Sequence, residues 1–210
     1  MPDCARCSAA LTSALVCEAC GALVPGAAAG DPFAVFGLTT AYTIDARALR
    51  KRLLKLSRLL HPDFHGTAEA AQRELAAHHS AELNSAHEVL ADDCRRADWL
   101  VRHLGGPSEQ TERAMPQAFL MEVLEWNEAL EAARGSAPGS APRAALGALA
   151  ADLEAQRRAL LQSLNRLLEP LPATGAPALA DARRALNALR YIDRAAGEIA
   201  ELVLGATAPR

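Results

Sequence analysis

Four of the five cysteines lie within the first 20 residues, as two C-x2-C pairs that nine other residues separate. Each pair can present two thiolates to one ion from a tight turn, and two such turns complete a tetrahedral zinc site. Two disulfides, a redox-active dithiol or iron in place of zinc are the alternatives. Because a closed four-thiolate site keeps no open coordination position, we expect it to stabilise the segment and not to catalyse a reaction. We therefore predict a structural zinc site whose ligands are Cys4, Cys7, Cys17 and Cys20.

A second group of chemically active residues is a run of basic side chains, since residues 47–58 contain six lysines and arginines and no acidic residue. Leucines at positions 49, 53, 56 and 60 lie on one face of a helix, which we expect to begin near Asp45 and to end before Pro62. A basic helix face is usually only solvated, but this one leads directly into the tripeptide His61, Pro62 and Asp63. No nucleophile accompanies the His–Asp pair, so we predict a binding protein and not an enzyme.

The composition indicates which elements position these groups. The chain has 48 Ala and 32 Leu but only 7 Val and 3 Ile, which favours an all-α fold. We expect a small N-terminal zinc-binding module, a helical hairpin and a C-terminal three-helix bundle, in segments 1–30, 31–106 and 107–210. The periodicity and the Gly/Pro breaks predict helices over residues 31–36, 45–60, 67–91, 95–104, 116–134, 142–169 and 178–204.

The charge and hydropathy of the chain exclude several classes of protein. The formal net charge is −3, which disfavours a generally basic nucleic-acid binder. No stretch approaches the roughly 18–20 uninterrupted apolar residues of a membrane span. The N-terminal segment has cysteines where a signal peptide needs an apolar core, so we expect a cytoplasmic protein that binds no membrane.

The predicted hairpin resembles the J-domain, the module by which J-type co-chaperones stimulate the ATPase of heat-shock chaperones of the seventy-kilodalton class. The matching parts are a short helix with Phe33 and Phe36, the basic helix, the His-Pro-Asp tripeptide, and a following helix that ends in residues 84–90. The resemblance implies that ATP is hydrolysed on the chaperone. It also implies that the chaperone is contacted by His61, Pro62, Asp63, Arg47, Arg50, Lys51, Lys55 and Arg58.

The segment 119–130, together with segments 95–100 and 35–38, is similar to the HscB family of J-type co-chaperones of iron–sulfur cluster assembly, and the similarity extends over residues 31–204. The resemblance implies two partners, an HscA-type heat-shock ATPase and an IscU-type scaffold protein on which clusters are built. The scaffold contacts that it implies on the bundle are Leu120, Met121, Leu124, Glu125, Glu128 and Tyr191. Residues 112–131 carry five acidic side chains against one arginine, so this region is acidic as well as apolar.

Two residues depart from the pattern of the family. Asn127 stands where a basic residue is common, and Tyr191 stands where phenylalanine is frequent. The alternative for the helix is that Leu120 and Leu124 belong to the core while the glutamates only solubilise it. The alternative functions are a general J-protein that delivers unfolded clients, although the chain lacks a Gly/Phe-rich linker, and a zinc-ribbon nucleic-acid binder that uses the basic helix.

Overall fold

The computed structural model describes residues 3–26, 30–61, 64, 69–137 and 139–205. These residues form seven α-helices, and the β-pairing among them is limited to two isolated bridges, Asp3 with Ala10 and Val16 with Leu23. The all-α fold that the alanine- and leucine-rich composition predicts is confirmed. None of the helices within the described residues is long and apolar enough to cross a lipid bilayer. The chain divides into two compact units, Met1–Trp99 and Leu100–Arg210.

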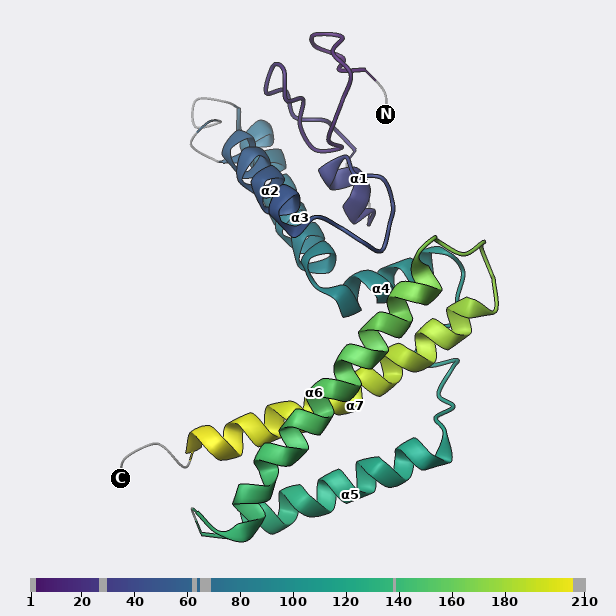
Figure 1. The fold of residues 1–210 in the computed structure, drawn as a ribbon. Coiled ribbons are helices and arrows are strands. Elements are labelled where there is room, and N and C mark those ends of the chain that lie inside the picture. The colour runs from purple at the N-terminus through teal and green to yellow at the C-terminus, as the bar shows by residue number, and fades with distance from the viewer. Residues whose placement is uncertain (1–2, 27–29, 62–63, 65–68, 138, 206–210) are drawn as a thin grey trace. The chain divides into compact units, whose positions relative to one another are not determined.

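The first unit contains a short helix and a helical hairpin. Helix α1 (Pro32–Phe36) is capped by the Asp31 carboxylate, and Phe33 and Phe36 of α1 are fully buried. Helices α2 (Ala46–Leu60) and α3 (Ala70–Ala91) run antiparallel beside one another (Figure 1). The hairpin buries five leucines, and α1 packs against both of its helices, mainly against α3. These leucines are Leu49, Leu56, Leu60, Leu83 and Leu90.

The boundaries of the hairpin follow from its sequence. The Asp45 carboxylate accepts hydrogen bonds from the backbone N–H groups of Arg47 and Ala48, and it therefore caps α2 at the predicted residue. The helix ends at Leu60, because the residue before a proline disfavours the helical conformation. The described part of the next helix begins at Ala70, and the positions 67 and 68 of the predicted helix lie outside the described residues.

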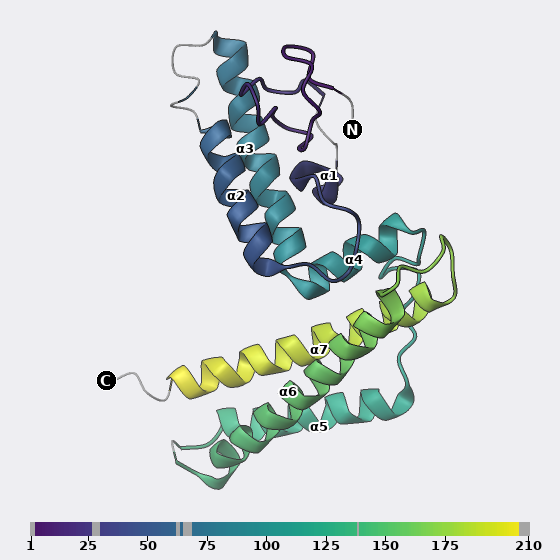
Figure 2. The ribbon, with the colours of Figure 1, turned by 45° about the horizontal axis from the view of Figure 1, so that its top comes forward.

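Helix α4 (Asp93–His103) follows α3 after one residue, and the second unit continues with a three-helix bundle. Its helices are α5 (Gln117–Arg134), α6 (Ala141–Leu168) and α7 (Ala178–Gly205), which lie along one another in Figure 2. Each helix begins and ends within one or two residues of its predicted limits, and differences of this size are normal at helix ends. The bundle core consists of Trp126, Leu130, Ala133, Leu146, Leu153, Ile192, Ala195 and Ile199.

Candidate functional site

The two C-x2-C pairs fold into two equivalent turns. In the first turn the Ser8 N–H donates to the Cys4 carbonyl oxygen at 2.8 Å, and in the second the Gly21 N–H donates to the Cys17 carbonyl oxygen at 2.8 Å. Both Ser8 and Gly21 have a positive φ, of 56° and 71°. Glycine adopts a positive φ freely, whereas serine does so at a cost. In both turns the residue with the positive φ closes the backbone behind the cysteines. The repeated geometry brings together the four thiols of Cys4, Cys7, Cys17 and Cys20.

The spacing of the sulfur atoms fits a single tetrahedral metal ion. All four Sγ atoms lie within 4.8 Å of one another, and Cys4 to Cys20 and Cys7 to Cys17 are each 3.7 Å apart. Zinc–thiolate bonds of about 2.3 Å at tetrahedral angles put the sulfurs about 3.8 Å apart, whereas a disulfide bond measures about 2.05 Å. Backbone N–H groups of Arg6 and Cys7 lower the pKa of the Cys4 thiol to about 6. The Ala9 backbone acts in the same direction on Cys7, but the neighbouring thiols and burial outweigh it and raise the pKa of Cys7 to about 12, so the thiols ionise as one interacting set. The four cysteines therefore fit a structural metal ion.

The apolar cluster around the cysteines is small, although Leu15 and Val16 of the same segment are also fully buried. The cluster comprises Cys4, Leu11 and Cys17, with small partly buried neighbours around them. A cluster of this size contributes little folding energy by itself, and a metal ion held by the four thiols would add to it. We refer to residues 3–24, with the four ligand cysteines, as the cysteine module.

The cysteine module packs against the helices of the first unit. The fully buried Ser13 hydroxyl donates to the Val35 carbonyl oxygen at 2.7 Å, and the Ala14 N–H donates to the Ala34 carbonyl oxygen at 3.2 Å, both on α1. On α3 the buried His79 imidazole places Nε2 2.9 Å from the Val24 carbonyl oxygen. The module is thus part of the same compact unit as the hairpin.

The packing of the module leaves no room for a side chain at Gly37, directly after α1. Its φ is 61°, and a Cβ atom built on it would lie 1.7 Å from the Thr12 carbonyl oxygen of the module. A side chain at this position would collide with backbone and not with a flexible side chain. Gly37 therefore permits the close approach of the module as well as the left-handed end of the helix.

Glu18, between two ligand cysteines, joins the module to the basic helix. Its carboxylate lies 2.6 Å from the Arg52 guanidinium, forms an ion pair with Lys55 and accepts a hydrogen bond from the Thr12 hydroxyl at 2.5 Å. Burial opposes the ionisation of Glu18, whose side chain is only 11% exposed. Lys55, Thr12 and Arg52 outweigh this effect and lower the pKa of the carboxyl to about 2. No local sequence pattern connects Glu18 with a helix more than 30 residues away, so the sequence alone does not predict this contact.

The remaining predicted chaperone contacts lie along an open surface of α2. Arg47, Arg50, Lys51 and Arg58 are exposed, and Leu54 among them is 53% exposed. A hollow of about 480 Å³ is lined by residues of this helix, including Lys51, Leu54 and Arg58. His61 is exposed at the C-terminal end of the helix, where its N–H donates to the Arg58 carbonyl oxygen. Pro62 and Asp63 of the tripeptide lie outside the described residues.

The predicted scaffold contacts gather on the surface of the bundle. The side chains of Leu120, Met121 and Leu124 are 42%, 53% and 56% exposed, and Glu125 and Glu128 are exposed on the same helix. The side of α5 that packs into the core carries Trp126, Leu130 and Ala133 instead. Leu120 and Leu124 are therefore surface residues. The alternative, in which these two leucines belong to the core of the bundle, does not agree with their exposure.

Tyr191 of α7 stands beside this surface. Its ring is 43% exposed and meets Phe119 of α5 edge-on, with ring centroids 5.9 Å apart. Phe119 in turn packs edge-on against the buried Trp126, at 5.6 Å. This aromatic series fixes the Tyr191 ring against α5, so residues distant in sequence form one surface. We refer to Leu120, Met121, Leu124, Glu125, Glu128 and Tyr191 as the α5 surface.

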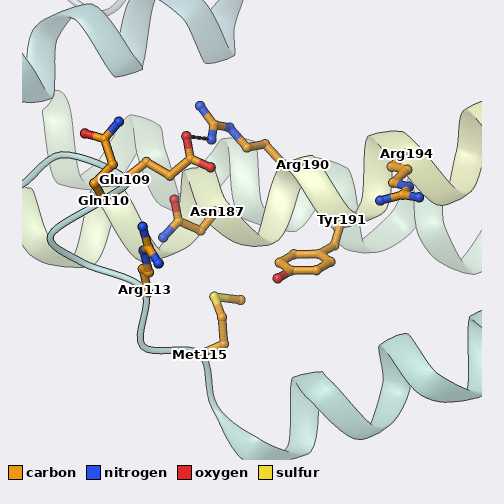
Figure 3. Close-up of a pocket in the computed structure, with 8 residues that line it drawn as sticks. All are labelled: Glu109, Gln110, Arg113, Met115, Asn187, Arg190, Tyr191 and Arg194. Atoms are coloured by element: carbon orange, nitrogen blue, oxygen red, sulfur yellow. Dashed lines mark ion pairs between the residues drawn. The ribbon is translucent and has the colours of Figure 1, made fainter.

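A hollow of about 530 Å³ lies next to Tyr191, between α7 and the segment before α5 (Figure 3). Asn187 lies at its wall, almost completely buried, with its Nδ2 donating to the Glu112 carbonyl oxygen at 2.8 Å. Within the described residues no hydrogen-bond donor reaches the Asn187 Oδ1. Arg113 and Met115 project towards the same hollow in Figure 3. The α5 surface thus borders a polar hollow, whose wall includes the almost completely buried Asn187.

The comparisons with known proteins agree with this arrangement. The model of the HscB C-terminal oligomerisation domain matches residues 115–200. The chain is 36% identical to a co-chaperone protein HscB homolog of Bordetella avium over 143 residues, 68% of this chain and 82% of that protein. A homolog from Ralstonia nicotianae is 36% identical over 168 residues, 79% of this chain and 92% of that protein.

Solved structures show the same fold. The chaperone HscB from Vibrio cholerae superposes with a TM-score of 0.68 at 27% identity, over 83% of this chain and 98% of that one. The human co-chaperone protein HscB superposes with a TM-score of 0.75 at 22% identity, over 95% of this chain and 97% of that one.

The helical hairpin with its basic α2 and the separate three-helix bundle define a co-chaperone of the J type. The relatives are named as co-chaperones and not as enzymes. The similarity extends over two thirds of this chain and more than four fifths of each of these relatives. This chain belongs to the HscB family.

Proposed function

We propose that this chain is a cytoplasmic co-chaperone of iron–sulfur cluster assembly with two binding surfaces. The α5 surface binds an IscU-type scaffold protein, and α2 with the His-Pro-Asp tripeptide binds an HscA-type ATPase of the seventy-kilodalton class and stimulates it. Membership of the HscB family supports both roles. The observation that carries the proposal is the α5 surface itself, where Leu120, Met121 and Leu124 are exposed together beside two glutamates. Adjacent exposed apolar side chains with a charged rim are typical of a protein-binding site.

The chemistry of α2 supports the role of the other surface. Its exposed cations steer association with an acidic partner, and His61 lies at the end of the helix where the tripeptide begins. In this proposal ATP is hydrolysed on the chaperone. The function therefore requires no catalytic side chain on this protein. The chain acts by proximity, since holding the scaffold and the ATPase on one molecule turns their encounter into a local event.

The metal has a structural role in this proposal. Cys4, Cys7, Cys17 and Cys20 would hold one zinc ion, which supplies a closed tetrahedral link between the two turns. The cysteine module then stays folded against α1, α2 and α3. None of the steps of chaperone or scaffold binding requires an open metal site.

The direct test is the steady-state ATPase activity of the cognate chaperone, measured with this protein, with the scaffold, and with both. We expect stimulation by this protein alone and a larger, synergistic stimulation when the scaffold is present. Additive rates would contradict the adaptor role.

A single substitution separates the two surfaces. We expect His61→Gln to retain the fold and the affinity for the scaffold but to lose ATPase stimulation, because it changes the tripeptide and leaves the α5 surface intact. Circular dichroism and scaffold titration provide the controls. Stimulation equal to that of the unsubstituted protein would contradict the role assigned to the tripeptide.

A further inference from the structure

The chain contains two lysines, and both lie on α2. Lys51 and Lys55 are one helical turn apart, so they share a helix face and a similar local backbone. In the part of the chain that the structure describes, Lys55 forms an ion pair with Glu18 of the cysteine module, whereas no ion pair is recorded for Lys51. Both lysines therefore lie on the open face of α2, but only Lys55 also contacts the module, so Lys51 serves as an internal reference for Lys55.

The position of Glu18 depends on the turn that contains it. Glu18 directly follows Cys17 and precedes Cys20, and the hydrogen bond from the Gly21 N–H to the Cys17 carbonyl oxygen closes this turn. Because the apolar cluster around the two turns is small, we expect the turn to persist only while the four cysteines are held together. The carboxylate that faces α2 is thus placed there by the metal ligands on either side of it.

Glu18 also changes the charge that α2 presents. One carboxylate meets the two cations Arg52 and Lys55, and it removes one unit of positive charge from that side of the helix. The exposed cations Arg47, Arg50, Lys51 and Arg58 are not neutralised by Glu18. An acidic partner would therefore meet an uneven surface, with its strongest positive charge away from the module.

We propose that Glu18 of the cysteine module is a specificity-determining residue for the surface of α2. It sets the charge pattern that this helix presents to its acidic partner, while the cysteines hold the module folded. The identity of that partner rests on the proposed function, but the pairing of Glu18 with Lys55 does not. Loss of the metal releases Glu18 and restores one positive charge to the module side of the helix. The chaperone then meets a more strongly and more evenly cationic surface.

The first test measures the acylation of the two lysines by an amine-reactive acetate ester, with peptide mass spectrometry as the readout. The samples are the metal-loaded full chain, the same chain after chelation under reducing conditions, and Glu18→Gln. The matched control is Glu74→Gln, which makes the same charge change at an exposed residue of α3. An ion pair of this exposure protects an amine about 1.5- to 5-fold. We expect the Lys55-to-Lys51 rate ratio to rise by that factor in the chelated chain and in Glu18→Gln, and to stay constant in Glu74→Gln.

Each outcome of this test decides one part of the proposal. Equal ratios in all four samples would overturn the pairing of Glu18 with Lys55. A ratio that rises in Glu18→Gln and not after chelation would overturn the dependence on the metal. Since Glu18→Gln keeps all four cysteines, it remains informative if chelation unfolds the whole first unit, which circular dichroism detects.

The second test measures the affinity of the same proteins for the chaperone at low and high ionic strength. We expect Glu18→Gln to bind about 1.5- to 5-fold more tightly than Glu74→Gln at low salt, and the difference to shrink as salt screens the charges. Equal affinities together with a raised lysine ratio would overturn the influence of Glu18 on the partner. If the unsubstituted chain does not bind the chaperone at all, the proposed function fails, whereas the lysine ratio still decides the role of Glu18 within the chain.

Discussion

The two proposed binding surfaces of this molecule are built in opposite ways. The surface of α2 consists of cations, and part of its charge is opposed by Glu18, which belongs to another segment of the same chain. The α5 surface consists of three exposed apolar side chains and two glutamates on one helix, with Tyr191 added from a second helix. The first surface therefore depends on the cysteine module, which is distant in sequence, whereas the second depends on local helix geometry and on the bundle core.

Because the two surfaces are built differently, a change in the cysteine module should affect one of them and not the other. A change in the cysteine module should alter α2, because Ser13, Glu18 and Val24 all contact the helices of the first unit. The same change should leave the α5 surface intact, because the cluster that supports it consists of residues of α5, α6 and α7 alone. Each of the following experiments either separates the two surfaces or shows that they are coupled.

The largest expected effect is that of metal removal. We expect chelation, or Cys17→Ser, to unfold residues 3–24 and to destabilise the first unit by on the order of 3 kcal/mol, or about 10–20 °C in its melting temperature. Hydrogen exchange measures this through the backbone N–H groups of Cys4, Ser8 and Gly21, which are hydrogen-bonded within the module.

The bundle provides the internal control for metal removal. Amide protection in α5, α6 and α7 should stay constant, and so should the affinity for the scaffold. Loss of protection in both units at once would show that the two surfaces are not independent. Metal analysis below about half an equivalent, with four titratable thiols and a folded module, would refute the structural metal site.

A comparable loss of stability, but without unfolding of the module, is expected at the point where the module approaches α1. We expect Gly37→Ala to cost about 2–4 kcal/mol, because the added Cβ would meet the Thr12 carbonyl oxygen at 1.7 Å and the φ of 61° disfavours alanine. Thermal unfolding of the first unit measures the loss.

The matched control for this substitution is Gly147→Ala. Gly147 lies within α6, and nothing lies within 4 Å of a Cβ atom built there. Alanine is a better helix former than glycine, so this variant should gain about 0.5–1 kcal/mol. A Gly37→Ala protein as stable as the unsubstituted chain would show that the module does not pack closely on α1.

The helices could be predicted from the sequence because their signals are local. Asp45 caps α2, Pro62 limits its end, and the spacing of the leucines indicates the buried face. The cluster of four cysteines could also be predicted, since each C-x2-C pair forms a turn by itself and the geometry of one ion requires two such turns.

The packing of the module could not be predicted in the same way. Ser13, Glu18, Gly37 and His79 belong to no motif, and their contacts join segments that are far apart in the sequence. A helix with six cations and no acidic residue indicates that a counter-charge is needed, but it does not indicate which carboxylate provides it. The contacts of the tripeptide remain a prediction, as do the scaffold contacts that the resemblance implies.

The α5 surface should respond to substitution in binding and not in stability. We expect Leu120→Ala with Met121→Ala to weaken scaffold binding about 10- to 100-fold, as the loss of roughly 1.5–3 kcal/mol of apolar contact predicts. The melting temperature should hardly change, because both side chains are about half exposed. Calorimetric titration with the scaffold and thermal unfolding measure the two quantities.

Leu130→Ala is the contrasting variant on the same helix. Leu130 is 1% exposed, so its truncation should cost about 2–5 kcal/mol of stability. If the double variant were as unstable as Leu130→Ala, then Leu120 and Met121 would be structural and the α5 surface would lose its assigned role.

The smallest expected effect distinguishes the two lysines of α2. Lys51→Gln should weaken association with the chaperone by up to about fivefold at low salt, because it removes a charge that Glu18 does not neutralise. Lys55→Gln should have a smaller effect, since Glu18 already opposes its charge. In a Glu18→Gln background the effect of Lys55→Gln should grow until it equals that of Lys51→Gln, because both amines then face the partner without a carboxylate. Association rates at several ionic strengths measure this cycle, and an effect of Lys55→Gln that is independent of Glu18 would show that the module does not shape the cationic surface of α2.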